Sequence, residues 1–266
     1  MKKALSIFMI SILIMGVLAA CGTSSKEKEE NAGGNGEEKK VLTMGTSADY
    51  PPFEYVETAK SDEIIGFDID LANLIAGELG YKVEVKDMDF NGLIGAIQAD
   101  RVDFVMAGMT PTKERKESVD FSDVYYTAKH MIVSAKDSNI KSIDDLKDKT
   151  VGVQLASIQE DKAEEIGETV KIKVEKRTRI PELIQEIKAG RIDAAIIEDT
   201  VAEGYFKNDK DLSGFTIEEE SEEDAGSAIA FPKGSKLTDE FNKVLKEKME
   251  NGEVEKLVVK WFGGEK

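Results

Sequence analysis

The chain has 266 residues, of which 41% are hydrophobic and 33% charged, and its formal net charge is −17. This length suits one large hydrophobic core or two smaller ones, and the strongly negative charge argues against nucleic acid as a partner. Because Cys21 is the only cysteine and His130 the only histidine, no internal disulfide can form, and metal-binding spacings such as HxxxH and CxxC are absent.

The first 21 residues have the pattern of an export signal. Lys2 and Lys3 precede an apolar stretch, residues 4–17, that is too short for a stable bilayer span. The stretch runs into Leu-Ala-Ala-Cys, so that small residues precede the thiol of Cys21. This pattern resembles a bacterial lipoprotein signal and predicts removal of residues 1–20 and lipidation of Cys21, with the protein held on the outer face of the cell membrane. The alternative is a buried cysteine beside an ordinary short anchor.

The segment that follows Cys21 is predicted to be a flexible tether, residues 21–40, because it is rich in Gly, Ser, Glu and Lys and shows no apolar periodicity. From residue 41 onward, short apolar runs alternate with helical patterns. Strands are predicted at 41–47, 82–88 and 102–109, and helices at 67–79 and 93–98. This alternation is typical of parallel strands joined by crossover helices, so the predicted fold class is α/β.

A second cycle of the same kind begins near Thr150. Strands are predicted at 151–155, 170–176 and 192–199, and helices at 159–166 and 180–188. The two cycles share a short repeat, LIGAIQADRVDFVM from Leu93 and LIQEIKAGRIDAAI from Leu183. Each copy contains a helix, then Arg, a β-branched residue and Asp, and then a buried strand. The sequence therefore predicts two similar α/β lobes.

The lobes are predicted to be joined by two crossings of the chain. Apolar, strand-like residues at 125–131 and again at 226–231 could carry the chain between lobes. Lobe 1 would then contain residues 41–128 plus 227–266, and lobe 2 residues 129–226. Two crossings of this kind imply a hinge.

Several motifs follow one another at consistent distances, namely GTSADYPPFEY, IGFDIDLANLIAGELG, AGMTPTKERKESVDFSDVYY, VGVQLASIQE and AAIIEDTVAEGY. Through them, nearly all of residues 41–262 resembles the polar amino-acid-binding lipoproteins of bacterial ABC importers, most of all the arginine-binding members from Gram-positive bacteria. The resemblance implies a periplasmic-binding-protein type II fold, in which two Rossmann-like α/β lobes with a two-strand hinge close over one amino acid. It also implies a monomer without a cofactor that presents its closed form to a permease and its ATPase.

A buried amino acid needs a cation for its carboxylate and an anion for its ammonium group. Arg115 follows the buried strand VDFVMAG, at the carboxyl end where open α/β sheets bind ligands, and the resemblance assigns it to the carboxylate. Without the motif it would be taken for a solvated arginine. The resemblance assigns Asp199, at the end of AAIIED, to the ammonium group, although this residue could also cap the next helix. Glu198 should point to the other face of the strand, toward the surface or hinge.

Backbone groups are expected to supply many of the remaining contacts. The resemblance places a carbonyl, an amide and a hydroxyl for the ligand in the run Ala107, Gly108, Met109 and Thr110. In the other lobe, Ser157, Ile158 and Gln159 open a helix whose amides favour an anion, here the ligand carboxylate. Many relatives have Gly and Thr where this chain has Ala156 and Ile158, so a side-chain hydroxyl is missing at Ile158.

The ligand's side chain is expected to lie between Tyr50 and Phe90, because a flat guanidinium stacks well on aromatic faces. Either ring could instead belong to the core, and Phe53 is assigned there. Basic-amino-acid binders commonly have an acid at the position of Ser47, whereas this chain has Asp49, which could meet the cationic tip or cap the turn before Pro51. Further candidates are Asp89, Glu160 and Gln154, of which Gln154 matches a side-chain contact position.

Other functions on the same fold remain to be weighed against binding. A few dehydratases and cell-wall-cleaving enzymes share the fold, but His130 lies in a predicted crossover and no Ser-His-Asp or Cys-His arrangement can be assembled around it. The sequence therefore predicts no enzyme activity. An amino-acid sensor would use the same cleft, and a glutamine- or cystine-binding protein of the same family is the nearer alternative. The acidic run at 218–224 suggests only a solvated loop.

Overall fold

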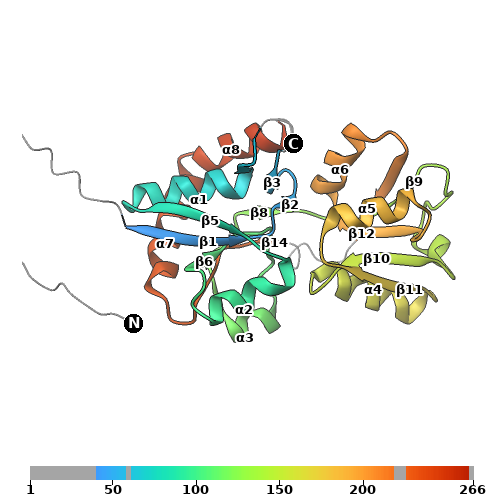
Figure 1. The fold of residues 1–266 in the computed structure, drawn as a ribbon, viewed down its shortest axis with the longest axis horizontal. Coiled ribbons are helices and arrows are strands. Elements are labelled where there is room, and N and C mark those ends of the chain that lie inside the picture. Colours follow the sequence, from blue (N-terminus) through green and yellow to red (C-terminus); the bar gives the residue numbers. More distant parts are fainter. Residues whose placement is uncertain (1–39, 58–60, 219–225, 264–266) are drawn as a thin grey trace, which may run out of the picture. The chain divides into compact units, whose positions relative to one another are not determined.

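The computed structural model describes residues 40–57, 61–218 and 226–263 (Figure 1). The predicted signal peptide, the lipidation site at Cys21 and the tether lie outside these residues except for Lys40. So does the acidic run, except for Glu218. No helix in the described ranges is long and apolar enough to cross a membrane.

The first lobe is built on a five-stranded sheet in the order β5-β1-β6-β15-β7. Its strands are β1 (Val41–Thr46), β5 (Lys82–Asp87), β6 (Phe104–Val105), β7 (Asp120–Phe121) and β15 (Ala230–Phe231). β1 pairs in parallel with both β5 and β6, whereas β15 joins β6 and β7 antiparallel. The helices of this lobe are α1 (Phe67–Glu78), α2 (Leu93–Gln98), α3 (Lys113–Ser118), α7 (Lys236–Glu250) and α8 (Glu253–Phe262). Three short strands, β2 (Asp49–Tyr50), β3 (Glu54–Val56) and β4 (Ile64–Ile65), form a separate small sheet.

The second lobe repeats this plan with the strand order β11-β10-β12-β9-β13. Its strands are β9 (His130–Ala135), β10 (Thr150–Gln154), β11 (Lys173–Arg177), β12 (Ala194–Glu198) and β13 (Leu212–Thr216). β10 is parallel to β11 and β12, and β9 is antiparallel to β12 and β13. The helices are α4 (Ile158–Thr169), α5 (Ile180–Lys188) and α6 (Asp199–Asn208). There are also two short 3-10 turns among the described residues, η1 (Phe90–Gly92) in the first lobe and η2 (Ile143–Leu146) in the second.

The predicted α/β elements are confirmed in both lobes. Helices α2 and α5 have the predicted bounds, and α1 ends one residue earlier than expected, before Gly80, whose φ of 81° suits glycine. The parallel pairings predicted from the alternation are present as well. The antiparallel strands β7 and β13 were not predicted, because their pairing joins segments far apart in the chain and leaves no local periodicity. β15 and the start of β9 lie in the strand-like segments predicted at 226–231 and 125–131, but there they were expected to be crossings between lobes and not sheet strands.

The two crossings between lobes lie side by side. β8 (Tyr126–Thr127) pairs antiparallel with β14 (Gly226–Ser227), with Tyr126 opposite Ser227. Tyr126 also stacks on Phe262, their ring centroids 4.3 Å apart, and packs edge-on against Phe53. Phe53 is fully buried, as expected of a core residue. The hinge is therefore packed against both α8 and the turn that carries Tyr50.

The repeated aspartate has the same structural role in both lobes. The Asp103 carboxylate accepts a hydrogen bond of 2.7 Å from the backbone N–H of Thr43, and the Asp193 carboxylate accepts one of 2.8 Å from that of Thr150. In return, the N–H of each aspartate donates to the carbonyl of the same threonine. Each aspartate directly precedes its own strand, β6 or β12, and ties it to the neighbouring parallel strand, β1 or β10, which is a structural reason for the repeat.

We expect Asp193→Ala to lower the free energy of unfolding by about 1–2 kcal/mol, because the charge-assisted hydrogen bond to the N–H of Thr150 is lost while that group stays half-buried. Urea denaturation followed by circular dichroism measures the change. Glu168→Ala, on the exposed face of α4, is the matched control and should cost less than about 0.5 kcal/mol. Equal losses in the two variants would contradict the role of Asp193.

Candidate functional site

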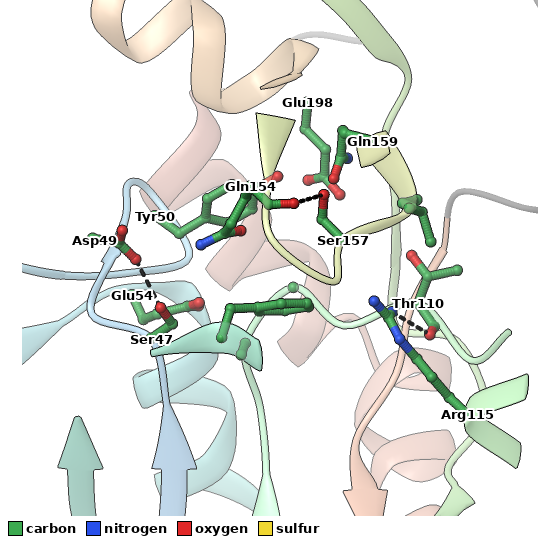
Figure 2. Close-up of a pocket in the computed structure, with 14 residues that line it drawn as sticks. Ser47, Asp49, Tyr50, Glu54, Thr110, Arg115, Gln154, Ser157, Gln159 and Glu198 are labelled. Carbon is green, nitrogen blue, oxygen red and sulfur yellow. Dashed lines mark hydrogen bonds between the residues drawn. The ribbon is translucent and has the colours of Figure 1, made fainter. Parts of the chain in front are cut away.

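A cavity of about 330 Å³, its mouth included, lies where the two lobes face each other. Residues of the first lobe that line it are Ser47, Asp49, Tyr50, Glu54, Phe90, Ala107, Gly108, Thr110 and Arg115. Residues of the second lobe that line it are Gln154, Ser157, Ile158, Gln159 and Glu198. Figure 2 shows Arg115 and Thr110 at one end and Ser47 and Asp49 at the other, with Tyr50 and Gln154 between them.

Arg115 provides the fixed positive charge of the cavity. Its backbone N–H donates to Thr112 Oγ1 at 3.2 Å, which starts α3 and directs the side chain back past Thr110. The guanidinium donates to the carbonyl of Thr110 and, across the cleft, to that of Ala156, both at 2.8 Å, and lies 5.3 Å from the centroid of the Phe90 ring. Burial lowers the pKa of Arg115 to about 10, so the group remains charged at neutral pH. Its other N–H groups are available to an anion.

The N-terminus of α4 lies at the same end of the cavity. Ser157 caps this helix: its hydroxyl accepts from the N–H of Glu160 and donates to the carbonyl of Gln154 at 2.7 Å. Ile158 and Gln159, which open the helix, line the cavity. The positive end of the helix dipole and Arg115 therefore favour negative charge at one place.

The last residue of β12, Glu198, lines the cavity, although Asp199 was the acid predicted to meet the ammonium group. Glu198 is only 2% exposed, so of its two expected locations, the surface and the hinge, the surface is wrong. Asp199 does not line the cavity, and its Oδ1 instead accepts from the N–H groups of Lys129 and Thr200. Glu198 ends β12 and Asp199 begins α6, and the sequence did not decide which of these two side chains lines the cavity.

Two further buried acids, neither of them predicted, meet beside the cavity. Glu54 of β3 and Asp68 of α1 are both 0% exposed. Asp68 Oδ2 accepts from the N–H of Gly108 at 3.0 Å and from the hydroxyl of Tyr125 at 2.9 Å. Asp68 Oδ1 and both oxygens of Glu54 have no donor among the described residues. Glu54 stands between Phe53 and Tyr55, and an acid isolated in an aromatic run is the signal that could have revealed it.

Burial controls the protonation of these acids. It raises the pKa of Glu198 to about 8 and that of Asp68 to about 6. The pKa of Glu54 is raised well above its usual value, first by burial and then by the negative charge of Asp68. The described residues hold no group of three or more acidic, His or Cys side chains placed to bind a metal ion. The pKa of about 8 keeps the proton on most Glu198 side chains at neutral pH, and the raised pKa of Glu54 favours its protonated form. A cation that entered could replace these protons.

Asp49 has a role that neither sequence alternative foresaw. Its Oδ1 accepts from the hydroxyl of Ser47 at 2.9 Å, and its Oδ2 accepts from the N–H of Ile180, at the start of α5 in the other lobe, at 2.8 Å. The neighbouring Arg179 donates at 2.8 Å to both Asp87 and Asp89 of the first lobe. Asp49 thus lines the cavity while it connects the lobes. Its charge is already met by donors.

The aromatic walls agree with the predicted pocket. Tyr50 and Phe90 both line the cavity and are almost fully buried, so Phe90 belongs to the pocket and to the core at once. Gly108 has a φ of 55°, and a Cβ there would lie 3.0 Å from the Tyr50 ring. A side chain at this position would be strained and would press on the ring, so glycine is needed for the close approach.

All the predicted ligand residues line the cavity except Met109 and Asp199. Met109 is buried in the core cluster with Phe90, and its carbonyl accepts from the N–H of Ala228. Of the other candidates for the ligand tip, Asp89 bonds Arg179, and Glu160 accepts from the N–H of Ala156 and pairs with Lys176. The structure thus brings the predicted residues together and adds Glu54 and Glu198.

Comparisons with known proteins agree with this geometry. The sequence profile of the bacterial extracellular solute-binding proteins, family 3, matches residues 42–264. The chain is 58% identical, over the full length of both proteins, to the arginine-binding extracellular protein ArtP of Bacillus subtilis (strain 168). A crystal structure of the substrate-binding protein of an amino acid ABC transporter superposes with a TM-score of 0.80 at 49% identity, covering 84% of this chain and all of that one. A structure of an ancestral arginine-binding protein bound to arginine superposes with a TM-score of 0.77 at 42% sequence identity, covering 84% of this chain and 98% of that one.

We expect the free energy of unfolding of the ligand-free protein to fall by about 3 kcal/mol between about pH 5 and pH 8 through Glu198 alone. The folded protein holds this proton up to a pKa of about 8, whereas the unfolded chain loses it near 4.5, so stability is lost as the pH rises. Urea denaturation at several pH values measures the slope. Glu198→Gln should flatten it over this range, and an unchanged slope in that variant would contradict the buried carboxyl.

Proposed function

The chain belongs to the family 3 bacterial extracellular solute-binding proteins, and from this premise we propose that it captures arginine outside the cytoplasm and delivers it to an ABC importer. The observation that carries the proposal is the charge layout of the cavity. A fixed cation and a helix N-terminus lie at one end, and two acids that line the cavity, Glu54 and Glu198, have buried carboxyl oxygens without a donor among the described residues. This layout complements a molecule with one carboxylate and two cationic groups. The family binds solutes, and no catalytic role is proposed.

The ligand carboxylate is assigned to Arg115 and the N-terminus of α4. Arg115 has a planar fork of donors, of which only some are used by Thr110 and Ala156. The amides of Ser157, Ile158 and Gln159 open the facing helix, and the Thr110 hydroxyl is close by. Because both lobes contribute, the carboxylate binds best when the cleft is closed.

The ligand ammonium is assigned to Glu198, with backbone groups of Ala107 and Gly108 as further partners. Glu198 has one oxygen, Oε2, without a donor among the described residues. An ammonium group supplies three donors and a compensating charge, so it would satisfy that oxygen and allow the carboxyl to ionise.

The ligand side chain is assigned to the space between Tyr50 and Phe90, with Glu54 and Gln154 at its end. A guanidinium can lie flat on an aromatic ring and donate to both oxygens of one carboxylate. Both oxygens of Glu54 lack a donor in the described structure, whereas Asp49 is already bonded to Ser47 and Ile180. Glu54 is therefore favoured over Asp49 as partner of the cationic tip.

Anchoring and assembly complete the proposal. The pattern of residues 1–21 supports removal of the leader and lipidation of Cys21, which would hold a monomer at the outer face of the membrane. The lobe boundaries stated above, 41–128 plus 227–266 and 129–226, follow the two sheets and the β8–β14 crossing. The closed form would be recognised by a permease that works with an ATPase.

We expect calorimetric titration of the full-length protein, unfolded and refolded to remove carried-over ligand, to give a micromolar or tighter dissociation constant for L-arginine. Lysine should bind at least about tenfold more weakly, because an ammonium cannot stack as a plane or fill both oxygens of Glu54. Glutamine and cystine should bind more weakly still. Preference for either neutral ligand would retain a solute-binding protein but contradict the assignment of the side-chain pocket.

A matched pair of variants tests which acid meets the ammonium. Glu198→Gln should weaken arginine binding at least about 100-fold, because the ammonium is left without a buried charge partner. Asp199→Asn keeps the shape of a side chain that does not line the cavity, so the dissociation constant should change less than about threefold. The reverse order of effects, measured by the same titration, would restore the original assignment of Asp199.

A further inference from the structure

We propose that Asp68, which does not line the cavity, makes the pocket selective for a cationic side chain by sharing a proton with Glu54, and that a bound guanidinium displaces this proton. The inference rests on the proposed function and extends it to the second layer of the site. It concerns a positioning residue that acts through Glu54 and does not touch the ligand.

The geometry requires a proton between the two groups when no ligand is bound. An ionised carboxylate can only accept hydrogen bonds. Asp68 Oδ2 is satisfied by the N–H of Gly108 and the hydroxyl of Tyr125, but Asp68 Oδ1 and both oxygens of Glu54 are buried without a donor. The N–H of Asp68 donates to the carbonyl of Phe53 at 2.9 Å, which places Asp68 beside Glu54. One proton held by Glu54 and directed at Asp68 would supply the missing donor.

The surroundings keep that proton in place. The groups that act on Glu54 from the packed elements are Asp68 of α1, Asp49 of β2 and Glu198 of β12, all acids, together with the buried hydroxyls of Tyr50 and Tyr125. Two adjacent carboxylates in such a site cannot both ionise unless a cation compensates them. Asp68 is held ionised by Gly108 and Tyr125, so Glu54 is the partner that carries the proton.

A guanidinium at Glu54 changes this balance. It brings one positive charge and several N–H donors, so the Glu54 carboxyl can lose its O–H proton to the solvent buffer and accept from the guanidinium instead. A neutral side chain brings no compensating charge, and the shared proton stays. Glu198 also gives up a proton when an α-ammonium binds, but it does so equally for every amino acid. The difference in proton release between a cationic ligand and a neutral ligand of the same shape therefore reports on the Glu54–Asp68 pair alone.

The test is calorimetric titration of the full-length protein at pH 7 in buffers of different ionisation enthalpy, with L-arginine and with L-citrulline, its uncharged analogue. The dependence of the observed enthalpy on the buffer gives the number of protons released. We expect arginine to release about one proton more than citrulline. Since release of a proton strengthens binding as the pH rises, the affinity for arginine relative to citrulline should rise with pH, by up to about tenfold per unit from pH 6.

Asp68→Asn tests the residue directly. An asparagine can accept from Gly108 and Tyr125 through its oxygen and donate to Glu54 through its amide, so no shared proton is needed. This variant should bind arginine with a dissociation constant within about tenfold of that of the native protein. Its extra proton release relative to citrulline should be at least halved, and its affinity for arginine relative to citrulline should rise less steeply with pH. Glu164→Gln, an exposed change on α4, should behave as the native protein does.

Each outcome decides the question. Equal proton release by arginine and citrulline, or unchanged release in a folded Asp68→Asn variant, would overturn the inference while leaving arginine binding intact. If Asp68→Asn does not fold, the comparison of the two ligands on the native protein decides; if citrulline does not bind, the arginine titrations of the native protein and Asp68→Asn decide. Absence of arginine binding to the native protein would overturn the proposed function and this inference with it.

Discussion

A carboxyl group removed from water must keep its proton or meet a cation, and this constraint governs the cleft. Among the described residues, the buried acidic side chains are Glu54, Asp68 and Glu198, all at or beside one cavity. A fold that buries acids without pairing them gives up stability, and burial here raises the pKa of each group. That cost is recovered when a ligand supplies the missing positive charge. The buried acids therefore lower the stability of the protein without a ligand, and the same acids strengthen the binding of a cationic ligand.

The cavity exists because two lobes face each other, and the contacts between them show how much of the closure depends on the ligand. Arg179 reaches Asp87 and Asp89 across the cleft, but these carboxylates are about half exposed, so each pair is worth about 1 kcal/mol or less. The bonds from Ile180 to Asp49 and from Arg115 to the carbonyl of Ala156 are more sheltered and add to the same state. Together they bias the hinge toward closure without fixing it. A ligand that contacts Arg115 on one lobe and Glu198 on the other stabilises the closed state further.

Much of this arrangement could be predicted from the sequence, and the failures share a cause. Helices α2 and α5 have strong apolar periodicity, and their bounds were predicted correctly. Arg115 was identified because its motif follows a buried strand. Asp199 was predicted to meet the ligand, whereas its neighbour Glu198 lines the cavity, because the sequence does not show in which direction each of two adjacent acids at a strand end points. Glu54 was missed because the acids that act on its carboxyl group, Asp68 of α1 and Glu198 of the other lobe, belong to elements elsewhere in the chain. Asp49 was expected either to meet the cationic tip or to cap a local turn, whereas its hydrogen bond to Ile180 joins it to the N-terminus of a helix 131 positions further along the chain.

The sequence by itself determined the local features: which segments are helices and strands, the repeated unit with Asp103 and Asp193, the two-lobed α/β class and most residues that line the cleft. These follow from periodicity, turn chemistry and motif order, which act over short distances along the chain. Only the tertiary structure decided which acids are buried and which are already paired across the lobes. Burial and Coulomb interactions depend on neighbours in space and on the exclusion of water, and the chain acquires both only when the lobes have packed.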